Sequence, residues 1–201
     1  GSSITLLVTR PRAIHAPGSN KPAIRGSSAH HSRAIGWGSY VPPTEITTED
    51  INRRVEFPTK RNVGSWVENA TGVRARRYAE PGGWPSDLAA EAAFKALEDA
   101  GLEPEDLDIL IYYGIARDVE EPATATIVQA KIGAVNAYAF DMANACNGFV
   151  SALDVLDSLI SSGRCHTGMI ACGEIMSQYV DWSPETKLDL KRSLMAYTFG
   201  D

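Results

Sequence analysis

One cysteine stands where the chain passes from a predicted buried strand into a predicted helix. Residues 140–149 read FDMANACNGF, which places Cys146 at the start of that helix. Unpaired backbone N–H groups and the positive end of the helix dipole stabilise a thiolate at such a position. The same amides can bind the oxyanion of an acyl thioester under attack. The position therefore favours acyl transfer, although an isolated cysteine in an apolar helix is more often a small core residue.

The other two cysteines, Cys165 and Cys172, make neither a disulfide framework nor a metal site with Cys146. No pair has the C-x-x-C spacing, and no histidines stand at ligand spacing. We therefore predict no metal and no cofactor. Free thiols are typical of a reducing compartment, so we expect a cytoplasmic location.

The surrounding sequence predicts strands that alternate with helices. Continuous apolar runs indicate buried strands, and a helix rich in Ala, Leu, Glu and Lys opens at Ser86 and Asp87 and ends before Gly101. The predicted strands are Ile109–Tyr113, Ala137–Phe140 and Gly168–Cys172, and the predicted helices are Leu88–Ala100, Ala123–Ile132 and Cys146–Ser161. This alternation predicts a layered α/β domain with a mixed, largely parallel core sheet.

The first 33 residues differ from the rest in composition. Residues 1–33 hold five basic residues and no acid, and they are rich in Ser, Pro, Gly and Ala. We interpret them as a disordered basic extension. The folded domain is expected to span residues 34–201, where a short strand over 34–43 precedes a helix capped by Thr47 and Asp50.

Composition excludes several classes of protein. The chain of 201 residues is 44% apolar and 22% charged, as in ordinary globular proteins. No run approaches the roughly 18 apolar residues that a membrane span needs. Residues 34–201 carry 14 basic and 25 acidic side chains, which argues against a nucleic-acid partner.

A spaced set of motifs resembles one known family across residues 34–201. The motifs are IGWGSYVP from Ile35, WVENATGV from Trp66, the block around Cys146, and FGD at the end. Together they resemble the N-terminal half of the thiolase-like condensing enzymes, in the branch of the ketoacyl-acyl-carrier-protein synthases III. The resemblance implies one half of a layered thiolase-like fold.

The resemblance also implies roles for individual residues. Cys146 becomes the nucleophile that takes an acyl group from a coenzyme A or carrier-protein thioester, before a Claisen condensation with a second thioester. Trp66 would stack on adenine, and Thr71 belongs to the same substrate-binding motif. An arginine that helps to hold coenzyme A in priming enzymes is replaced here by Ala70. Arg192 and Phe199 are weaker candidates for thioester or pocket contacts, and a purely structural role is favoured for each.

Residues 116–125 are similar to the head-to-head condensing enzymes of long-chain olefin synthesis. Those enzymes join two acyl thioesters without a malonyl donor. The resemblance matches Glu121, before Pro122, to a glutamate that reaches across a dimer and removes an α-proton near the partner's cysteine. The alternative is that Glu120 and Glu121 are solvated loop acids.

The family's catalytic histidine and asparagine belong to a C-terminal half that this sequence does not contain. We therefore expect that half as another chain or fragment, and a dimer of complete units. The leading hypothesis is an acyltransferase of lipid or secondary metabolism that forms a C–C bond between two acyl thioesters. Two alternatives stay open: a priming synthase with a malonyl donor, and a non-catalytic partner subunit of a heteromeric synthase.

Overall fold

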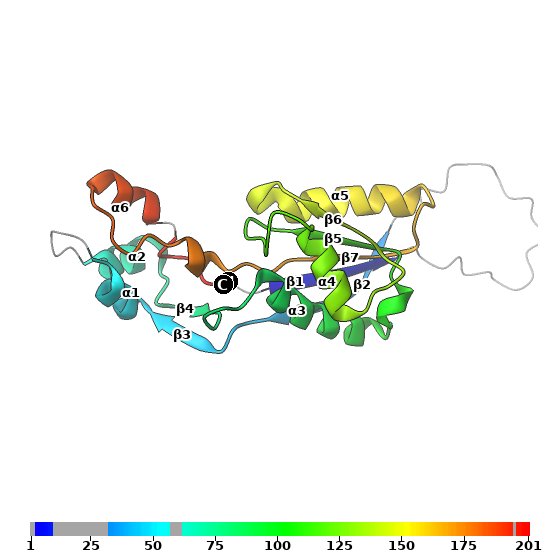
Figure 1. Ribbon diagram of the computed structural model, residues 1–201, viewed down its shortest axis with the longest axis horizontal. Coiled ribbons are helices and arrows are strands. Elements are labelled where there is room, and N and C mark those ends of the chain that lie inside the picture. Colours follow the sequence, from blue (N-terminus) through cyan, green and yellow to red (C-terminus); the bar gives the residue numbers. More distant parts are fainter. Residues whose placement is uncertain (1–2, 10–31, 57–61, 195) are drawn as a thin grey trace, which may run out of the picture.

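The computed structural model describes residues 3–9, 32–56, 62–194 and 196–201. Its main feature is a five-stranded sheet in the order β2-β1-β7-β5-β6. β5 pairs in parallel with β6 and β7, whereas β1 pairs antiparallel with β2 and β7. Four of the five strands therefore run in one direction and β1 is reversed (Figure 1). The bounds are β1 (Ser3–Thr9), β2 (Arg33–Tyr40), β5 (Ile109–Tyr113), β6 (Tyr138–Met142) and β7 (Thr167–Ala171).

The prediction that residues 1–33 are disordered is wrong for the start of the chain, and the folded domain does not begin at residue 34. β1 lies between β2 and β7, and its Leu7 and Val8 are buried. A run of only five residues, Ile4–Val8, of which four are apolar, suffices for a strand that neighbours cover on both edges. The Ser- and Pro-rich average of the whole segment hid this run. Residues 10–31 of the predicted extension lie outside the described residues.

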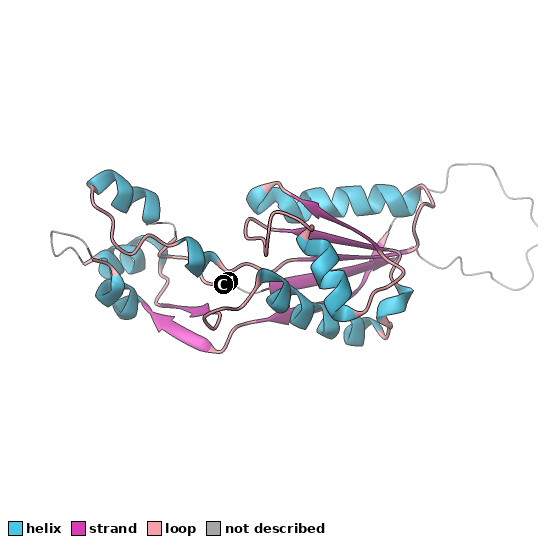
Figure 2. Cartoon of the chain, in the orientation of Figure 1, coloured by secondary structure: helices cyan, strands magenta, loops and turns pink. Residues whose placement is uncertain are grey.

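Helices cover both faces of the sheet (Figure 2). The faces alternate along each strand: Leu110 packs with the cluster beneath α3 (Pro85–Ala100) and α4 (Thr124–Ile132), and Ile111 with the cluster beneath α5 (Gly148–Ser161). Such strands, buried on both faces, explain the continuous apolar runs in the sequence. The predicted strands and helices are thus confirmed, and none of their ends is shifted by more than three residues.

Two glycines of β2 allow α3 to approach the sheet closely. A Cβ at Gly36 would lie 2.6 Å from the carbonyl oxygen of Ala96, and one at Gly38 would lie 2.2 Å from that of Ala92. Backbone cannot yield as a flexible side chain can, so both positions need glycine.

A smaller group of elements lies beyond one end of the sheet, at the left of Figure 1. It consists of the antiparallel strands β3 (Thr44–Thr47) and β4 (Ala75–Tyr78) with α1 (Thr48–Arg54), α2 (Val63–Thr71) and α6 (Lys187–Ser193). Its own core includes Ile51, Val67 and Tyr197. The predicted cap is present, since the N–H of Asp50 donates to Thr47 Oγ1 at 3.1 Å.

Two short 3-10 turns lie before and after strands of the main sheet. η1 (Pro104–Asp106) precedes β5, and η3 (Met176–Tyr179) follows β7. Among the described residues, none of the helices has both the length and the apolar character that crossing a membrane requires.

Candidate active site

The carboxyl ends of three parallel strands meet at one edge of the sheet. Tyr112 of β5 is in register with Asp141 of β6 and with Ala171 of β7. The segments that follow these strands therefore emerge side by side. They are residues 114–123, which carry Glu121, residues 143–147, which carry Cys146, and residues 172–175. Open parallel sheets bind their ligands at such an edge, so we place the candidate active site here.

Cys146 lies in a short 3-10 turn, η2 (Ala145–Asn147), that joins β6 to α5, and it is exposed. The predicted start of the helix, Cys146, is therefore two residues too early, because α5 begins at Gly148. Asn147 makes no side-chain cap on α5; its amide and that of Asn144 donate instead to Ser151 Oγ, at 3.3 and 2.8 Å. A helix N-terminus without a side-chain cap leaves first-turn N–H groups for an incoming oxyanion.

The residue before the nucleophile has an unusual backbone. Ala145 has φ of 44°, a positive value that no other non-glycine residue of the described chain adopts. This region costs an L-residue free energy, and such residues cluster at functional sites. The sequence carries no direct signal for it beyond the small side chain of alanine.

Burial separates Cys146 from the other two thiols. Cys165 and Cys172 are 6% and 7% exposed. Burial raises the pKa of Cys172 to about 12, and the nearby Glu174 carboxylate adds to the effect. Burial also raises the pKa of Cys165, with a further contribution from Asp108. Both thiols stay protonated near neutral pH, so they are structural and Cys146 is the candidate nucleophile.

The loop that carries Glu121 begins where β5 ends. Glu121 is exposed, and among the described residues no hydrogen bond or ion pair joins it to Cys146. Within this chain, the structure thus places Glu121 and Cys146 on neighbouring segments of one edge without direct contact.

Carboxylates anchor the two ends of this loop. Glu174 accepts the N–H groups of Ile115 and Ala116 at 2.7 and 2.9 Å. Asp141 of β6 accepts those of Thr124 and Ala125 at 2.9 and 2.7 Å. Burial raises the pKa of Glu174, although these hydrogen bonds oppose the rise.

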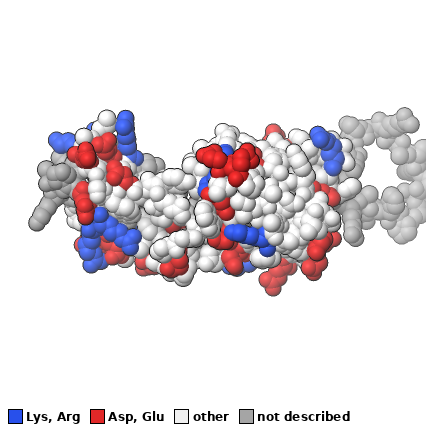
Figure 3. All heavy atoms as spheres, in the orientation of Figure 1, with Lys and Arg blue, Asp and Glu red and all other residues white. Residues whose placement is uncertain are grey.

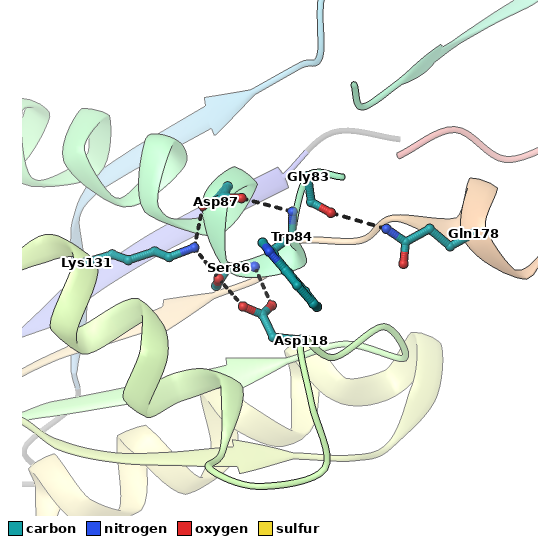
Figure 4. A network of polar contacts seen from close by, with 7 residues as sticks. All are labelled: Gly83, Trp84, Ser86, Asp87, Asp118, Lys131 and Gln178. Atoms are coloured by element: carbon teal, nitrogen blue, oxygen red, sulfur yellow. Dashed lines mark hydrogen bonds and ion pairs between the residues drawn. The ribbon is translucent and has the colours of Figure 1, made fainter. Parts of the chain in front are cut away.

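A polar network joins the loop to the start of α3 (Figure 4). Asp118 accepts from the backbone and hydroxyl of Ser86, and Lys131 of α4 donates to Ser86 Oγ at 2.6 Å and pairs with Asp87. The sequence analysis missed this network because its members come from three separate elements.

Trp66 lies on α2, half exposed, in a groove of about 460 Å³ between α2 and α6. Two lysines, Lys187 and Lys191, line the same groove. Figure 3 shows other Lys and Arg side chains at this end of the molecule. The sequence analysis did not identify the lysines, although their spacing of four places them on one face of a helix.

The remaining candidates are less closely tied to this groove. Thr71 donates to the carbonyl of Val67 at 2.7 Å and accepts the N–H of Val73 at 3.2 Å, so its hydroxyl stabilises the end of α2. Arg192 is exposed on α6 but is not among the residues that line the groove. Phe199 is 45% exposed near the chain end.

Comparison with known proteins supports one family. Residues 140–201 match the family model described as 3-oxoacyl-[acyl-carrier-protein (ACP)] synthase III. The beta-ketoacyl-[acyl-carrier-protein] synthase III of Caldanaerobacter subterraneus is 38% identical over 74% of this chain and 43% of its own length. That of Ehrlichia canis is 37% identical over 75% of this chain and 46% of its own. The chain therefore spans less than half the length of these relatives.

Solved structures of similar proteins point to the same family. The 3-oxoacyl-[acyl-carrier-protein] synthase III of Aquifex aeolicus matches with a TM-score of 0.67 and 36% identity, over 77% of this chain and 47% of that one. A variant of OleA from Xanthomonas campestris, with bound lauric acid and lauroyl-CoA, matches with a TM-score of 0.72 and 29% identity over 83% and 52%. These matches confirm the resemblance and the mixed α/β fold that the sequence predicts.

Proposed function

We propose that this chain, which is similar to the N-terminal half of the 3-oxoacyl-[acyl-carrier-protein] synthases III, is the nucleophile-bearing half of an acyl-condensing enzyme. The observation that carries the proposal is the placement of Cys146. Its thiol is exposed at the N-terminus of α5, at the edge of the sheet where β5, β6 and β7 end.

The first step is transfer of an acyl group to Cys146. Its thiolate attacks the thioester carbonyl, and N–H groups at the start of α5 stabilise the oxyanion. The C–S bond of the donor then breaks, and the donor thiol leaves. In the second step, the α-carbanion of another thioester attacks the acyl-enzyme and Cys146 leaves as a thiolate. The product contains a new C–C bond.

Acylation is tested by intact mass on the complete assembly incubated with an acyl-coenzyme A. We expect one added acyl group per chain, which Cys146→Ala removes and the matched control Cys165→Ala keeps. Failure of acylation in the parent protein would favour the non-catalytic partner subunit. Labelling that persists in Cys146→Ala would reject Cys146 as the nucleophile.

For the carbanion, we favour direct removal of an α-proton by Glu121 over the decarboxylation of a malonyl donor. Glu121 is exposed on a loop at the edge that bears Cys146, so its carboxylate can reach a second molecule docked there. The similarity to OleA is compatible with proton removal by Glu121, whereas the similarity to the synthases III favours the priming alternative.

The two readings differ in the outcome of Glu121→Gln. A base is not needed for thiol attack, so acylation should stay near the parent rate while condensation falls by about 10²-fold or more. The neighbouring Glu120→Gln is the matched control. Condensation that survives Glu121→Gln and requires a malonyl-carrier protein would establish the priming reaction instead.

A dimer could form along β6, the outermost strand on one side of the sheet. β6 has partly exposed side chains; its first residue, Tyr138, is 68% exposed, and Val135 just before the strand is 75% exposed. The free side of an outermost strand carries unpaired backbone groups, which readily pair with another copy of the chain. If Glu121 works across such a dimer, mixing Cys146→Ala with Glu121→Gln subunits should restore activity, because one mixed site then holds both groups.

We also propose that a second thiolase-like half packs on α5. In Figure 1, α5 lies at the outside of the described structure, and three of its apolar side chains are not fully covered: Val150 is 58% exposed, and Leu153 and Leu159 are only partly buried. An uncovered apolar face of this kind marks an interface. If residues 1–201 alone proved monomeric and cooperatively folded, this part of the proposal would fail.

The donor we favour is coenzyme A, held in the groove between α2 and α6. The flat indole of Trp66 offers a stacking surface for adenine, and Lys187 and Lys191 offer cations for phosphate groups. The lysines thus supply the positive charge that Ala70 lacks. Such an enzyme, with free thiols only, suits the cytoplasm.

A further inference from the structure

Asp118 connects the two ends of the short segment that carries Glu121. Asp118 stands three residues before Glu121, and Thr124 stands three residues after it. The N–H of Asp118 donates to Thr124 Oγ1 at 3.4 Å. Thr124 is itself held by Asp141, through the 2.9 Å hydrogen bond of its backbone N–H. These two hydrogen bonds hold Asp118, on one side of Glu121, in a fixed place relative to Thr124 on the other side.

The carboxylate of Asp118 ties the same point to a different element. It accepts the N–H of Ser86 at 2.9 Å through Oδ1 and the hydroxyl of Ser86 through Oδ2 (Figure 4). Ser86 is buried in the first turn of α3, and it also receives a hydrogen bond from Lys131. Charge-assisted hydrogen bonds from two donors hold a carboxylate in one orientation.

These contacts limit where Glu121 can go. Three extended residues span at most about 10 Å, so Glu121 must stay within that reach of both Asp118 and Thr124. If Asp118 lost its hold on Ser86, the nearest side-chain anchor before Glu121 would be the hydrogen bond of Ala116 to Glu174, and five extended residues would allow a reach of about 17 Å. A displacement of about 1 Å is enough to impair a catalytic group.

We propose that Asp118 is a positioning residue that sets the location of Glu121 by binding the loop to the first turn of α3. The proposal rests on the proposed function, in which Glu121 is the base of the condensation step. Asp118 touches neither thioester nor Cys146 and acts through the loop.

A matched control lies in the same network. Asp87 also accepts a backbone N–H at the start of α3, that of Trp84 at 2.9 Å, and it pairs with Lys131. Among the described residues, no hydrogen bond or ion pair joins Asp87 to residues 114–123. Loss of either carboxylate therefore disturbs the first turn of α3, but only the loss of Asp118 releases the loop.

The experiment compares Asp118→Ala, Asp118→Asn and Asp87→Ala in the complete assembly, with Glu121→Gln as reference. We expect Asp118→Ala to lower kcat for condensation by about 10-fold to 10²-fold with little change in the acylation rate of Cys146. Asp118→Asn keeps one acceptor oxygen for the N–H of Ser86 and should recover much of the loss. Asp87→Ala should leave condensation near the parent value.

The outcomes separate the two proposals. If Glu121→Gln leaves condensation unchanged, the proposed role of Glu121 fails. If Glu121→Gln impairs condensation but Asp118→Ala does not, the positioning role of Asp118 fails. Equal losses in Asp118→Ala and Asp87→Ala, or a parallel loss of acylation, would also overturn it, because both point to general disturbance of the fold. Should Asp118→Ala fail to fold, Ser86→Ala removes the hydroxyl that donates to Asp118 Oδ2 and should lower condensation without lowering acylation, and parent-like condensation in that variant would overturn the positioning role.

Discussion

Tyr113 and Gly148 lie in direct contact at the candidate active site. A Cβ atom at Gly148 would stand 3.0 Å from Cδ2 and 3.1 Å from Cβ of Tyr113. The ring of Tyr113 is also 5.8 Å from that of Phe149, centroid to centroid. The last residue of β5 thus packs against the first residue of α5, and this contact sets where the helix begins behind Cys146.

This contact predicts a selective effect of Gly148→Ala. The added methyl group must displace Tyr113 or the start of α5, so we expect a loss of about 1 kcal/mol in unfolding free energy. The acylation rate of Cys146 should fall by about 10-fold, because the first-turn amides move with the helix. Acylation followed by mass spectrometry measures the effect.

The control for Gly148→Ala is Phe94→Ala, since Phe94 is exposed on α3, which covers the face of the sheet opposite α5. It should acylate at the parent rate. Adding Tyr113→Leu to Gly148→Ala should restore part of the loss by making room. A parent-like rate in Gly148→Ala would show that the contact does not position the helix.

Thiol titration should distinguish the three cysteines. Because Cys146 is exposed and Cys165 and Cys172 are buried, a disulfide reagent at pH 8 should react rapidly with one thiol in the folded protein. All three should react in denaturant. Cys146→Ala should remove the rapid phase and leave the slow ones. Two or more rapid thiols in the parent protein would contradict the burial that the structure shows.

Alkaline pH should weaken folding through Cys172. Its pKa is raised by burial from 9.0 to about 12, so its contribution to stability is complete below pH 9 and is lost as the pH rises toward 12. Over that interval, the unfolding free energy of the parent should fall more steeply than that of Cys172→Ala, by up to about 1 kcal/mol per pH unit. Denaturant titrations at several pH values measure the two slopes. The slopes of the parent and of Cys172→Ala should agree below pH 9. Equal slopes above pH 9 would show that Cys172 is not the source of the alkaline loss of stability.

The groove beside Trp66 should discriminate between donors. Replacing Lys187 and Lys191 by Gln removes two exposed charges, each worth up to about 1 kcal/mol toward a phosphate, so KM for an acyl-coenzyme A should rise about 10-fold. An acyl-pantetheine thioester, which lacks the nucleotide, should be used as before. Arg164→Gln, near the far end of α5, is the control. An equal loss with both donors would show that the groove does not bind the nucleotide.

Sequence alone determined the parts of this protein that depend on neighbouring residues. The spacing of apolar residues predicts α5, the composition and Gly101 predict α3, and the buried runs predict β5 and β7, because these patterns act within one element. The motif around Cys146 likewise predicts a thiol at a strand-to-helix junction, and the structure places it there.

Only the tertiary structure decided what depends on residues far apart in the chain. β1 was missed because the composition of residues 1–33 as a whole outweighed its short apolar run, and it is a strand because β2 and β7 cover both of its edges. The hold of Asp118 on Ser86 and the meeting of Trp66 with Lys187 join elements separated by 32 residues or more. Hydrogen bonds and grooves between distant segments leave no periodicity in sequence, because each partner satisfies its own local pattern whether or not the other is near.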